Sequence, residues 1–331
     1  MKTHSIPGTD LMISSLALGG WLTFGGGVSD AESARILHRA IDGGINFIDL
    51  ADVYAAGAAE RVVGRFLQET DRDRLVISSK VFWPMGENAP DRGLSRHHIH
   101  GSIDRTLERL GLQELDIYFC HREDPDTELA ETVQAMGDLV TAGKVRAWGT
   151  SCWRPATIRK AHQLAAQLGV APPRVEQPQY NLLERWIESE LVPTCQQLAM
   201  AVVVFSPLCG GVLTGKYLNG VPAGSRAASS KWLDQYLRPD THRAVQSLVS
   251  WCQSQGLDPA VVALAWVMQQ PGITAAISGA TSAAQLSNNL QAATLELDAQ
   301  QRSMLASWFP ADRRSLLMRL LAKLRRMVKR S

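Results

Sequence analysis

Residues 46–54 read NFIDLADVY, an apolar run that ends at Asp49 and is followed five residues later by Tyr54. Two similar runs end on basic side chains. The run LVISSK ends at Lys80, and the run LDIYFCH ends at His121. Short apolar runs that are rich in isoleucine, valine and aromatic residues are typical of buried strands. We therefore expect three strands, each with a polar side chain at or just after its carboxyl end.

Further apolar runs alternate with amphipathic segments along most of the chain. The strand-like runs begin near Leu16, Ile45, Leu75, Leu115, Val145, Val175, Ala201 and Thr274. The helical segments cover 30–42, 58–70, 95–110, 126–142, 154–168, 184–199, 258–270 and 282–293. Eight strands that alternate with eight helices predict an α/β protein with a (β/α)8 TIM barrel, whose chemistry gathers at the carboxyl ends of the strands.

Three additions to the barrel are expected. Residues 4–15 form a predicted N-terminal hairpin around the turn PGTD at 7–10. Residues 207–257 are too many for a simple connection, so long mouth loops are expected to fold over the barrel there. We predict one barrel domain over 1–311 and a basic C-terminal helix in a tail over 312–331.

The composition narrows the classes of function. The 331 residues are 45% hydrophobic, enough for a large core, and the net charge of +2 gives no reason to expect a nucleic acid partner. The N-terminus shows no signal-peptide run, and no stretch approaches the ~20 apolar residues of a membrane span. The five cysteines form no CxxC pair, so reduced thiols in the cytoplasm are expected. No metal site is expected, because no nearby carboxylate or cysteine completes a ligand set with the histidines of 97–100.

The tail is strongly basic. It holds eight lysine and arginine residues and one aspartate, a net charge of +7, so the rest of the chain carries −5 of the total of +2. Apolar residues recur at helical spacing over 316–328 with basic residues between them, which predicts an amphipathic helix. Two interpretations stay open. The helix docks on the barrel, or it makes peripheral contact with an anionic membrane surface or a membrane protein.

Asp49, Tyr54, Lys80 and His121 together suit the reduction of an aldehyde or ketone. A tyrosine with a pKa near 10 is a poor acid at neutral pH, and a lysine ammonium beside it is expected to lower that pKa. Asp49 would hold Lys80 in place, and His121 would orient the carbonyl that receives the proton from Tyr54. The alternative is a buried ion pair with a core tyrosine and a capped histidine. Four such residues on one rim favour the catalytic interpretation.

Longer motifs resemble the aldo-keto reductase superfamily over about 4–300. These motifs are NFIDLADVY, the strand end at Lys80, DIYFCHR, GTS (149–151), EQPQYN (176–181) and SPL (206–208). A further likeness, to the β subunits of voltage-gated potassium channels and their bacterial relatives, lies in VYAAGAAE (53–60), KVFW (80–83), RGLSRHHI (92–99) and SPLCGGVLTGKY (206–217). The channel subunits have asparagine where this chain has His121, so this chain keeps the full tetrad of ordinary reductases.

The resemblance implies that NADPH binds at the barrel mouth. The implied cofactor contacts are Gly20, Trp21, Asp49, Ser151, Cys152, Gln177, Phe205, Ser206, Pro207, Leu208, Lys216, Arg226, Gly279, Thr281, Gln285, Asn288 and Asn289. Cys152 stands where many reductases have an asparagine that contacts the nicotinamide carboxamide. Ser151 and Gln177 are left to make that contact.

Two features suit the phosphates of such a cofactor. Lys216 and Arg226 are cations in matched motifs, although solvated loop charge is the alternative reading of both. The segment 279–289 resembles the loop and helix at the adenosine end. A helix that begins near Thr281 and Ser282 would offer free N–H groups to an anion.

We therefore expect an NADPH-dependent reductase of a small carbonyl substrate, with the proton supplied by Tyr54. The alternative is a redox-sensing auxiliary subunit that binds NADP(H) and docks on a membrane protein such as a potassium channel. Phe24 and Trp83 either form an apolar wall for the substrate or pack the mouth loops. The likeness to the channel subunits also implies a homo-oligomer. The sequence does not name the physiological carbonyl.

Overall fold

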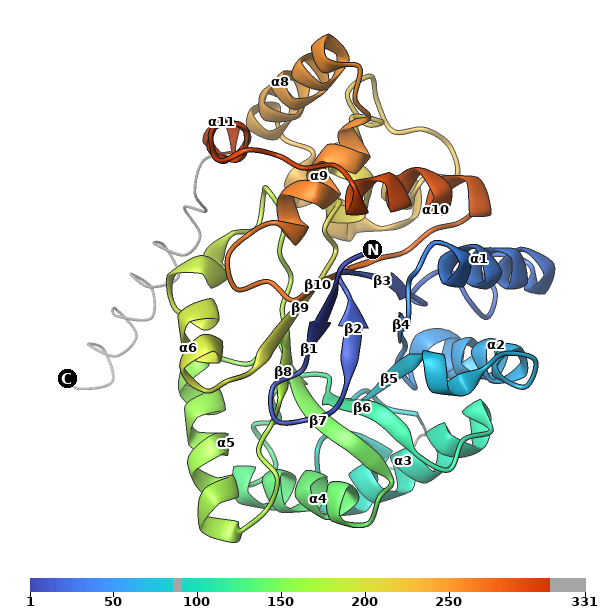
Figure 1. Ribbon diagram of the computed structural model, residues 1–331, viewed down its shortest axis with the longest axis vertical. Coiled ribbons are helices and arrows are strands. Elements are labelled where there is room, and N and C mark those ends of the chain that lie inside the picture. Colours follow the sequence, from blue (N-terminus) through green and yellow to red (C-terminus); the bar gives the residue numbers. More distant parts are fainter. Residues whose placement is uncertain (86–90, 310–331) are drawn as a thin grey trace.

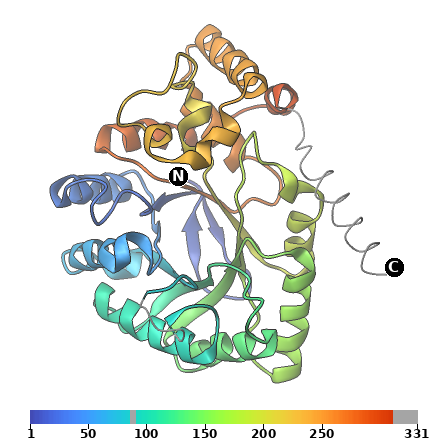
Figure 2. The same ribbon diagram turned by 180° about the vertical axis from the view of Figure 1, so that it is seen from behind.

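A computed structural model describes residues 1–85 and 91–309, and its centre is a closed barrel of eight parallel strands. Around the barrel the strands follow the order β10-β3-β4-β5-β6-β7-β8-β9, and the helices surround them when the barrel is seen from either side (Figures 1 and 2). The strands are β3 (Leu16–Gly19), β4 (Phe47–Asp49), β5 (Val76–Val81), β6 (Leu115–Cys120), β7 (Val145–Ser151), β8 (Val175–Gln177), β9 (Ala201–Phe205) and β10 (Ala275–Ser278). The predicted TIM barrel is confirmed.

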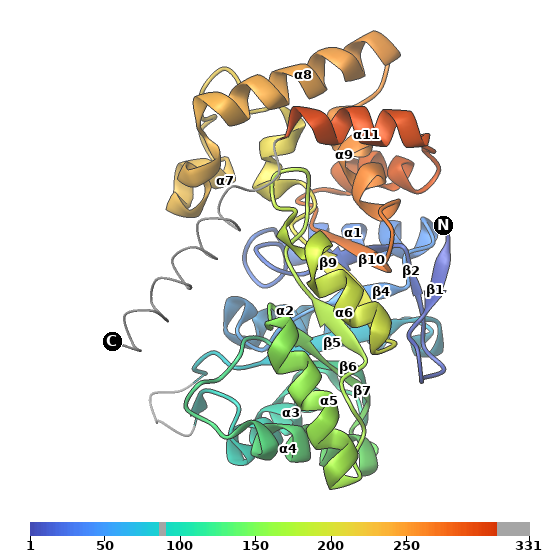
Figure 3. The same cartoon turned by 90° about the vertical axis from the view of Figure 1, so that its left-hand side faces the viewer.

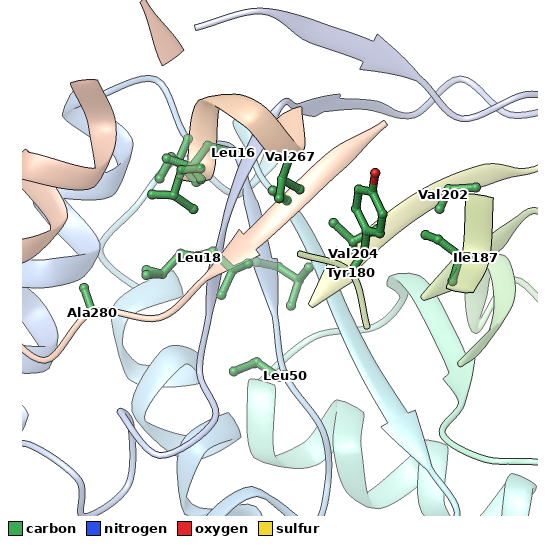
Figure 4. Close-up of a cluster of buried hydrophobic side chains, with 14 of the residues drawn as sticks. Leu16, Leu18, Leu50, Tyr180, Ile187, Val202, Val204, Val267 and Ala280 are labelled. Carbon is green, nitrogen blue, oxygen red and sulfur yellow. The ribbon is translucent and has the colours of Figure 1, made fainter. Parts of the chain in front are cut away.

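The barrel strands are mostly apolar because both of their faces are buried. In β3, Leu16 and Leu18 pack outward against the helices, whereas Ala17 points into the barrel interior. The outer layer continues through Val202 of β9 and Val267 of α9 (Pro259–Met268), as Figure 4 shows. Parallel strands covered on both faces give the continuous apolar runs seen in the sequence.

Helices follow the strands close to the predicted segments. They are α1 (Asp30–Asp42), α2 (Ala58–Leu67), α3 (Arg96–Leu110), α4 (Leu129–Thr141), α5 (Pro155–Leu168), α6 (Leu191–Gln197), α9 and α10 (Ala283–Leu290). Side chains fix several of their first turns. Ser29 and Ser95 accept hydrogen bonds from the backbone of α1 and α3, and Asp258 does the same for α9, which starts with a proline.

The predicted continuous helix over 184–199 is wrong. A short 3-10 turn covers Trp186–Ser189, and α6 begins only at Leu191, after Glu190 has left the helical region with φ −143°. Pro193 explains the break. Its ring carries no N–H and restricts the residue before it, so proline is tolerated in the first turn of a helix and not in its interior.

The predicted N-terminal hairpin is present and closes the bottom of the barrel. Strands β1 (Thr3–Ser5) and β2 (Met12–Ser14) pair antiparallel, and the hairpin lies across the barrel in Figure 1. Its buried side chains Ile6, Leu11 and Ile13 share one apolar cluster with the inner barrel residues. The cavity of the molecule therefore lies at the opposite end, where the strands carry their carboxyl termini.

The long segment 207–257 covers the mouth with its first half only. Residues up to Arg226, including the 3-10 turn Cys209–Thr214, line the mouth cavity. After the short α7 (Arg226–Ser229) and the 3-10 turn Lys231–Tyr236, helix α8 (Pro239–Gln255) packs outside the mouth, against α9 and α11 (Ala299–Trp308), as Figure 3 shows. The expectation that the whole segment folds over the mouth is corrected accordingly.

The C-terminal tail is not among the residues that the structure describes. The predicted amphipathic helix over 316–328, and with it the tail over 312–331, lies outside the described residues. Within residues 1–85 and 91–309, no helix has both the length and the apolar character needed to cross a membrane.

Candidate active site

A cavity of about 670 Å³ opens at the carboxyl ends of the barrel strands, the end where TIM barrels place their chemistry. Most of the residues expected at a cofactor or substrate site line it. They are Trp21, Asp49, Tyr54, Trp83, His121, Ser151, Gln177, Phe205, Ser206, Pro207, Leu208, Lys216, Arg226, Gly279, Thr281, Gln285, Asn288 and Asn289. Residues that follow the first barrel strand, β3, and the last, β10, thus meet at one cavity.

Four expected residues do not line the cavity. Lys80 is fully buried beneath the cavity wall. Gly20, expected at the cofactor, donates its backbone N–H to the carbonyl of Asp49 at 2.9 Å. Phe24, expected either at a substrate wall or in the packing of the mouth loops, is buried in the core beside Gly20. The Sγ of Cys152 lies 3.9 Å from the Gln177 carbonyl oxygen, away from the cavity.

Lys80 joins three groups through its ammonium. Its Nζ donates to Oδ2 of Asp49 at 2.6 Å, to the Leu50 carbonyl at 2.6 Å and to the Tyr54 hydroxyl at 3.3 Å. An ammonium has three donors, so every one of them is used. Burial lowers the pKa of Lys80, but the negative charge of Asp49 and the contact with Tyr54 outweigh it, and the pKa is raised. Lys80 is therefore a permanent cation beside the Tyr54 oxygen.

The second oxygen of Asp49 is also fixed. Its Oδ1 accepts from the Ser78 hydroxyl at 2.8 Å and from the Gln177 side-chain amide at 2.9 Å. Ser78 comes from β5, the strand next to β4, and Gln177 comes from β8 on the other side of the barrel, so two separate strands hold this carboxylate. One N–H of the Gln177 side-chain amide is used by Asp49, which leaves its second N–H and its carbonyl oxygen for other partners.

Tyr54 lies at the start of a strained turn. The two residues that follow it, Ala55 and Ala56, have φ of 49° and 51°, in the left-handed region that residues with a Cβ rarely occupy. Strain of this kind gathers at functional sites, where the surrounding structure holds it in place. The turn delivers the Tyr54 hydroxyl to Lys80, with the ammonium 5.0 Å from the centroid of the ring.

The expected lowering of the Tyr54 pKa is wrong. Burial raises the pKa of the Tyr54 hydroxyl, and although the Lys80 charge lowers it, the net pKa lies above the ordinary value of about 10. The sequence shows the neighbouring charge but not the depth at which the phenol is buried. Tyr54 is therefore a protonated phenol at neutral pH, which is the form that can donate a proton.

His121 is a neutral side chain in this site. Burial lowers its pKa to about 2, and the charges of Lys80 and Arg122 add to that effect. The ring faces Tyr54 edge-on with centroids 6.1 Å apart, and Trp83 on its other side with centroids 6.2 Å apart. A neutral imidazole carries a single N–H. Within the described part of the chain, its buried Nδ1 has no hydrogen-bond partner.

The cations Lys216 and Arg226 line the other half of the cavity. In the described ranges neither forms an ion pair with a carboxylate. The Arg226 guanidinium lies 5.3 Å from the centroid of the Trp21 ring, and burial lowers its pKa. Gly211 makes the bend beside Lys216 possible, because its φ is 91° and a Cβ there would lie 2.6 Å from Cε of Lys216. The exposed Lys216 and the half-buried Arg226 are thus cations on the cavity wall without carboxylate partners among the described residues, which suits an anionic ligand.

The start of α10 does not offer the free N–H groups that were expected. The backbone N–H of Thr281 donates to the Gln285 side chain at 2.8 Å. The N–H of Ala283 donates to Glu32 at 2.9 Å, and the N–H of Gln285 donates to Ser282 at 3.1 Å. Glu32 belongs to α1, which packs against α10, and this distant carboxylate could not be anticipated from the local sequence.

Several residues that line the cavity were not expected from the sequence, and Arg122 is the charged one beside the tetrad. Arg122 stands directly after His121 in DIYFCHR and lines the cavity beside it. The sequence does contain a signal for Arg122, because this residue directly follows His121, which was already expected at the site.

The chain is similar to proteins of one known family. The sequence model described as the aldo/keto reductase family matches residues 15–308. A "Probable voltage-gated potassium channel subunit beta" of Oryza sativa subsp. japonica is 37% identical over 299 residues, 88% of this chain and 91% of that protein. The protein of the same name in Arabidopsis thaliana is 36% identical over 299 residues, with the same coverage. A "Putative voltage-gated potassium channel subunit beta" of Schizosaccharomyces pombe is 37% identical over 292 residues, 85% of each chain.

Proposed function

Because this chain belongs to the aldo/keto reductase family, we propose that it is an NADPH-dependent oxidoreductase that reduces an aldehyde or ketone to the alcohol. The family supports oxidoreductase activity, and the finer statement rests on one observation. Lys80 bridges Asp49 and Tyr54 at 2.6 Å and 3.3 Å on the wall of the cavity, with His121 opposite the Tyr54 ring. A phenol and an imidazole that face one cavity are suited to protonate and orient a carbonyl oxygen.

Tyr54 is proposed as the proton donor. NADPH, when bound, supplies the hydride that converts the carbonyl into an alkoxide. An alkoxide is about as basic as hydroxide, whose conjugate acid water has a pKa of about 15.7. A buried phenol is a stronger acid than that even with its raised pKa, so the Tyr54 proton moves to the alkoxide. The Lys80 ammonium, 3.3 Å away, stabilises the negative charge that then develops on the Tyr54 oxygen.

His121 is proposed to orient the carbonyl. With a pKa of about 2 it stays uncharged at neutral pH, so it donates a hydrogen bond without competing as an acid. Since its buried Nδ1 has no partner among the described residues, we assign the single ring proton to Nε2. An N–H at that position is a donor for the carbonyl oxygen that Tyr54 protonates.

The residues of the cavity fit NADPH. Lys216 and Arg226 supply two cations at the half of the cavity away from the tetrad, and the polar side chains of Thr281, Gln285 and Asn288 line the same cavity. Charge-assisted hydrogen bonds from an arginine or lysine suit phosphate oxygens, and a 2′-phosphate is the group by which NADPH differs from NADH. This donor set supports NADPH over NADH.

The test is a panel of simple aldehydes and ketones with NADPH oxidation as the readout and identification of the alcohol product. We expect steady turnover of several members, with little turnover when NADH replaces NADPH at equal concentration. A protein that binds NADPH tightly and oxidises it with no carbonyl of the panel would contradict the proposed reaction.

A second candidate function is favoured by the names of the relatives. Three similar proteins are named as β subunits of voltage-gated potassium channels. The corresponding proposal is an auxiliary subunit that binds NADP(H), assembles as a homo-oligomer and docks on a membrane protein such as a potassium channel. Cofactor retention without turnover, together with co-purification of the chain with a channel, supports this candidate. His121 favours the reductase, because asparagine is expected there in the channel subunits.

A further inference from the structure

We propose that Arg122 binds a carboxylate of the substrate, so that the preferred substrates are aldehydes or ketones that carry a separate carboxylate group. This inference rests on the proposed carbonyl reduction and names the substrate class. Arg122 follows His121 at the end of β6 and lines the cavity together with Tyr54 and Trp83. It therefore stands directly beside the proposed catalytic residues, whereas the cations proposed for the cofactor phosphates belong to the segment 207–257.

The charge of Arg122 is not neutralised by the protein around it. No carboxylate of residues 1–85 and 91–309 forms an ion pair with it, and the two acidic residues that follow it have other partners. Glu123 pairs with Arg154 at 2.7 Å. Asp124 accepts from the Leu94 backbone at 2.7 Å and from the Thr127 hydroxyl at 2.8 Å. Lys80, by contrast, is neutralised by Asp49, so Arg122 leaves the carbonyl side of the cavity with an excess positive charge.

The guanidinium of Arg122 is held by its Nη1 atom, and its Nε and Nη2 atoms are left to bind a ligand. Its Nη1 donates to the His121 carbonyl at 2.5 Å and lies 3.4 Å from the Ser151 hydroxyl. Its carbon lies 5.9 Å from the centroid of the Trp83 ring, which fixes the plane from a second direction. In the part of the chain that the structure describes, Nε and Nη2 have no acceptor. That edge is the planar pair of donors that binds a carboxylate through two parallel hydrogen bonds.

The neighbours of Arg122 define the path of such a substrate. The ring of His121 contacts those of Tyr54 and Trp83, at 6.1 Å and 6.2 Å between centroids. Trp83 is 38% exposed, and the Arg122 guanidinium lies 5.9 Å from the centroid of its ring. A substrate whose carbonyl is held by Tyr54 and His121 would have Trp83 and Arg122 as its next neighbours. The geometry points to an oxo acid with an apolar or aromatic spacer.

The test uses the three carboxybenzaldehyde isomers, each paired with its methyl ester. An ester withdraws more electron density from the ring than a carboxylate, so intrinsic reactivity favours the ester and a preference for the acid reports binding. We expect kcat/KM for at least one acid to exceed that of its ester by about tenfold or more. Arg122→Met should lower this acid-to-ester ratio about 10- to 100-fold, and Arg122→Lys should retain part of the ratio because it keeps the charge without the fork.

Arg154→Met is the matched control, because Arg154 is an exposed arginine near the same rim that pairs with Glu123 and does not line the cavity. It should leave the ratio unchanged. Two results would overturn the carboxylate site: an equal loss of kcat/KM for acid and ester in Arg122→Met, or a wild-type acid-to-ester ratio near one for all three isomers. In either case, reduction of the esters would still support the proposed reductase.

If neither acids nor esters are reduced, the proposed reaction fails and binding decides this inference. Calorimetric titration of the three hydroxymethylbenzoates into NADP⁺-loaded protein should then show binding that Arg122→Met weakens by about tenfold or more. Absent binding, or equal binding to wild type and variant, overturns the carboxylate site.

Discussion

The ammonium of Lys80 and the carboxylate of Asp49 meet at 2.6 Å, with side chains 0% and 4% exposed. The pair forms the floor of the candidate site, and neither charge has access to bulk water. Each partner therefore depends on the other, since an unpaired charge at this depth would lose its hydration without compensation.

Removing one member of this pair should destabilise the fold. We expect Lys80→Met to lower the free energy of unfolding by about 3–5 kcal/mol, because Asp49 is left as an uncompensated buried charge. The double variant Asp49→Asn/Lys80→Met should recover part of that loss. Urea unfolding of Lys80→Met, Asp49→Asn, the double variant and the wild type measures both terms. Additive losses in the double variant would show that the two charges do not stabilise each other.

The neutral state of His121 predicts a pH-dependent stability difference. Its pKa is about 2 in the folded protein and near 6.5 when unfolded, so below pH 6.5 the unfolded state binds the extra proton and the stability contribution of His121 is lost as the pH falls. His121→Asn lacks this term. When the pH is lowered from 7.5 to 5, the free energy of unfolding of the variant should therefore rise by about 2 kcal/mol relative to that of the wild type. A difference between the two proteins that is independent of pH would mean that His121 is not buried in its neutral form.

Arg226 should decide between the two nicotinamide cofactors. Arg226→Met should raise the dissociation constant for NADPH about 10-fold or more, and that for NADH by less than about threefold, because a charge-assisted bond to the 2′-phosphate is lost only for NADPH. Fluorescence titration measures both constants. Lys231→Ala is the control, because Lys231 belongs to the same mouth segment but does not line the cavity. Equal losses for both cofactors would place Arg226 away from the 2′-phosphate.

The basic tail gives a prediction from the sequence alone. If the segment 313–331 forms an interfacial helix, the full-length protein should bind vesicles that contain anionic lipid at low salt, at ~1 kcal/mol per basic residue near the surface. Deletion of the segment should abolish that binding and leave turnover intact. A full-length protein that ignores such vesicles at low salt would support a helix docked on the barrel.

The architecture could be predicted from the sequence because its signals are local. Buried strands such as β6 are largely apolar runs, and Ser95 and Asp258 are local signals for the starts of α3 and α9, where both side chains cap the helix. The break within 184–199 was not predicted because the apolar periodicity of the segment continues across it. Pro193, which lies in the first turn of α6, is the residue that restricts the backbone there. The family inferred from the motifs is confirmed by the comparisons.

The site was predictable as a set of residues but not in its electrostatics. The burial that raises the pKa of Tyr54 is set by the whole barrel, and it outweighs the neighbouring Lys80 that the sequence does reveal. Similarly, Glu32 reaches the start of α10 from a helix 251 positions earlier in the chain. Arg122 was overlooked because an arginine after a strand usually faces solvent, and only the fold shows that no described carboxylate pairs with it.

The most direct test of the account is the turnover of Tyr54→Phe with a neutral aldehyde that the wild type reduces. This variant keeps the ring and removes only the hydroxyl that lies 3.3 Å from Lys80, so the fold and the NADPH dissociation constant should be retained. We predict that kcat falls by at least ~10²-fold, the lower end of general acid catalysis. A correctly folded Tyr54→Phe protein that binds NADPH and turns over at a near-normal rate would contradict the account.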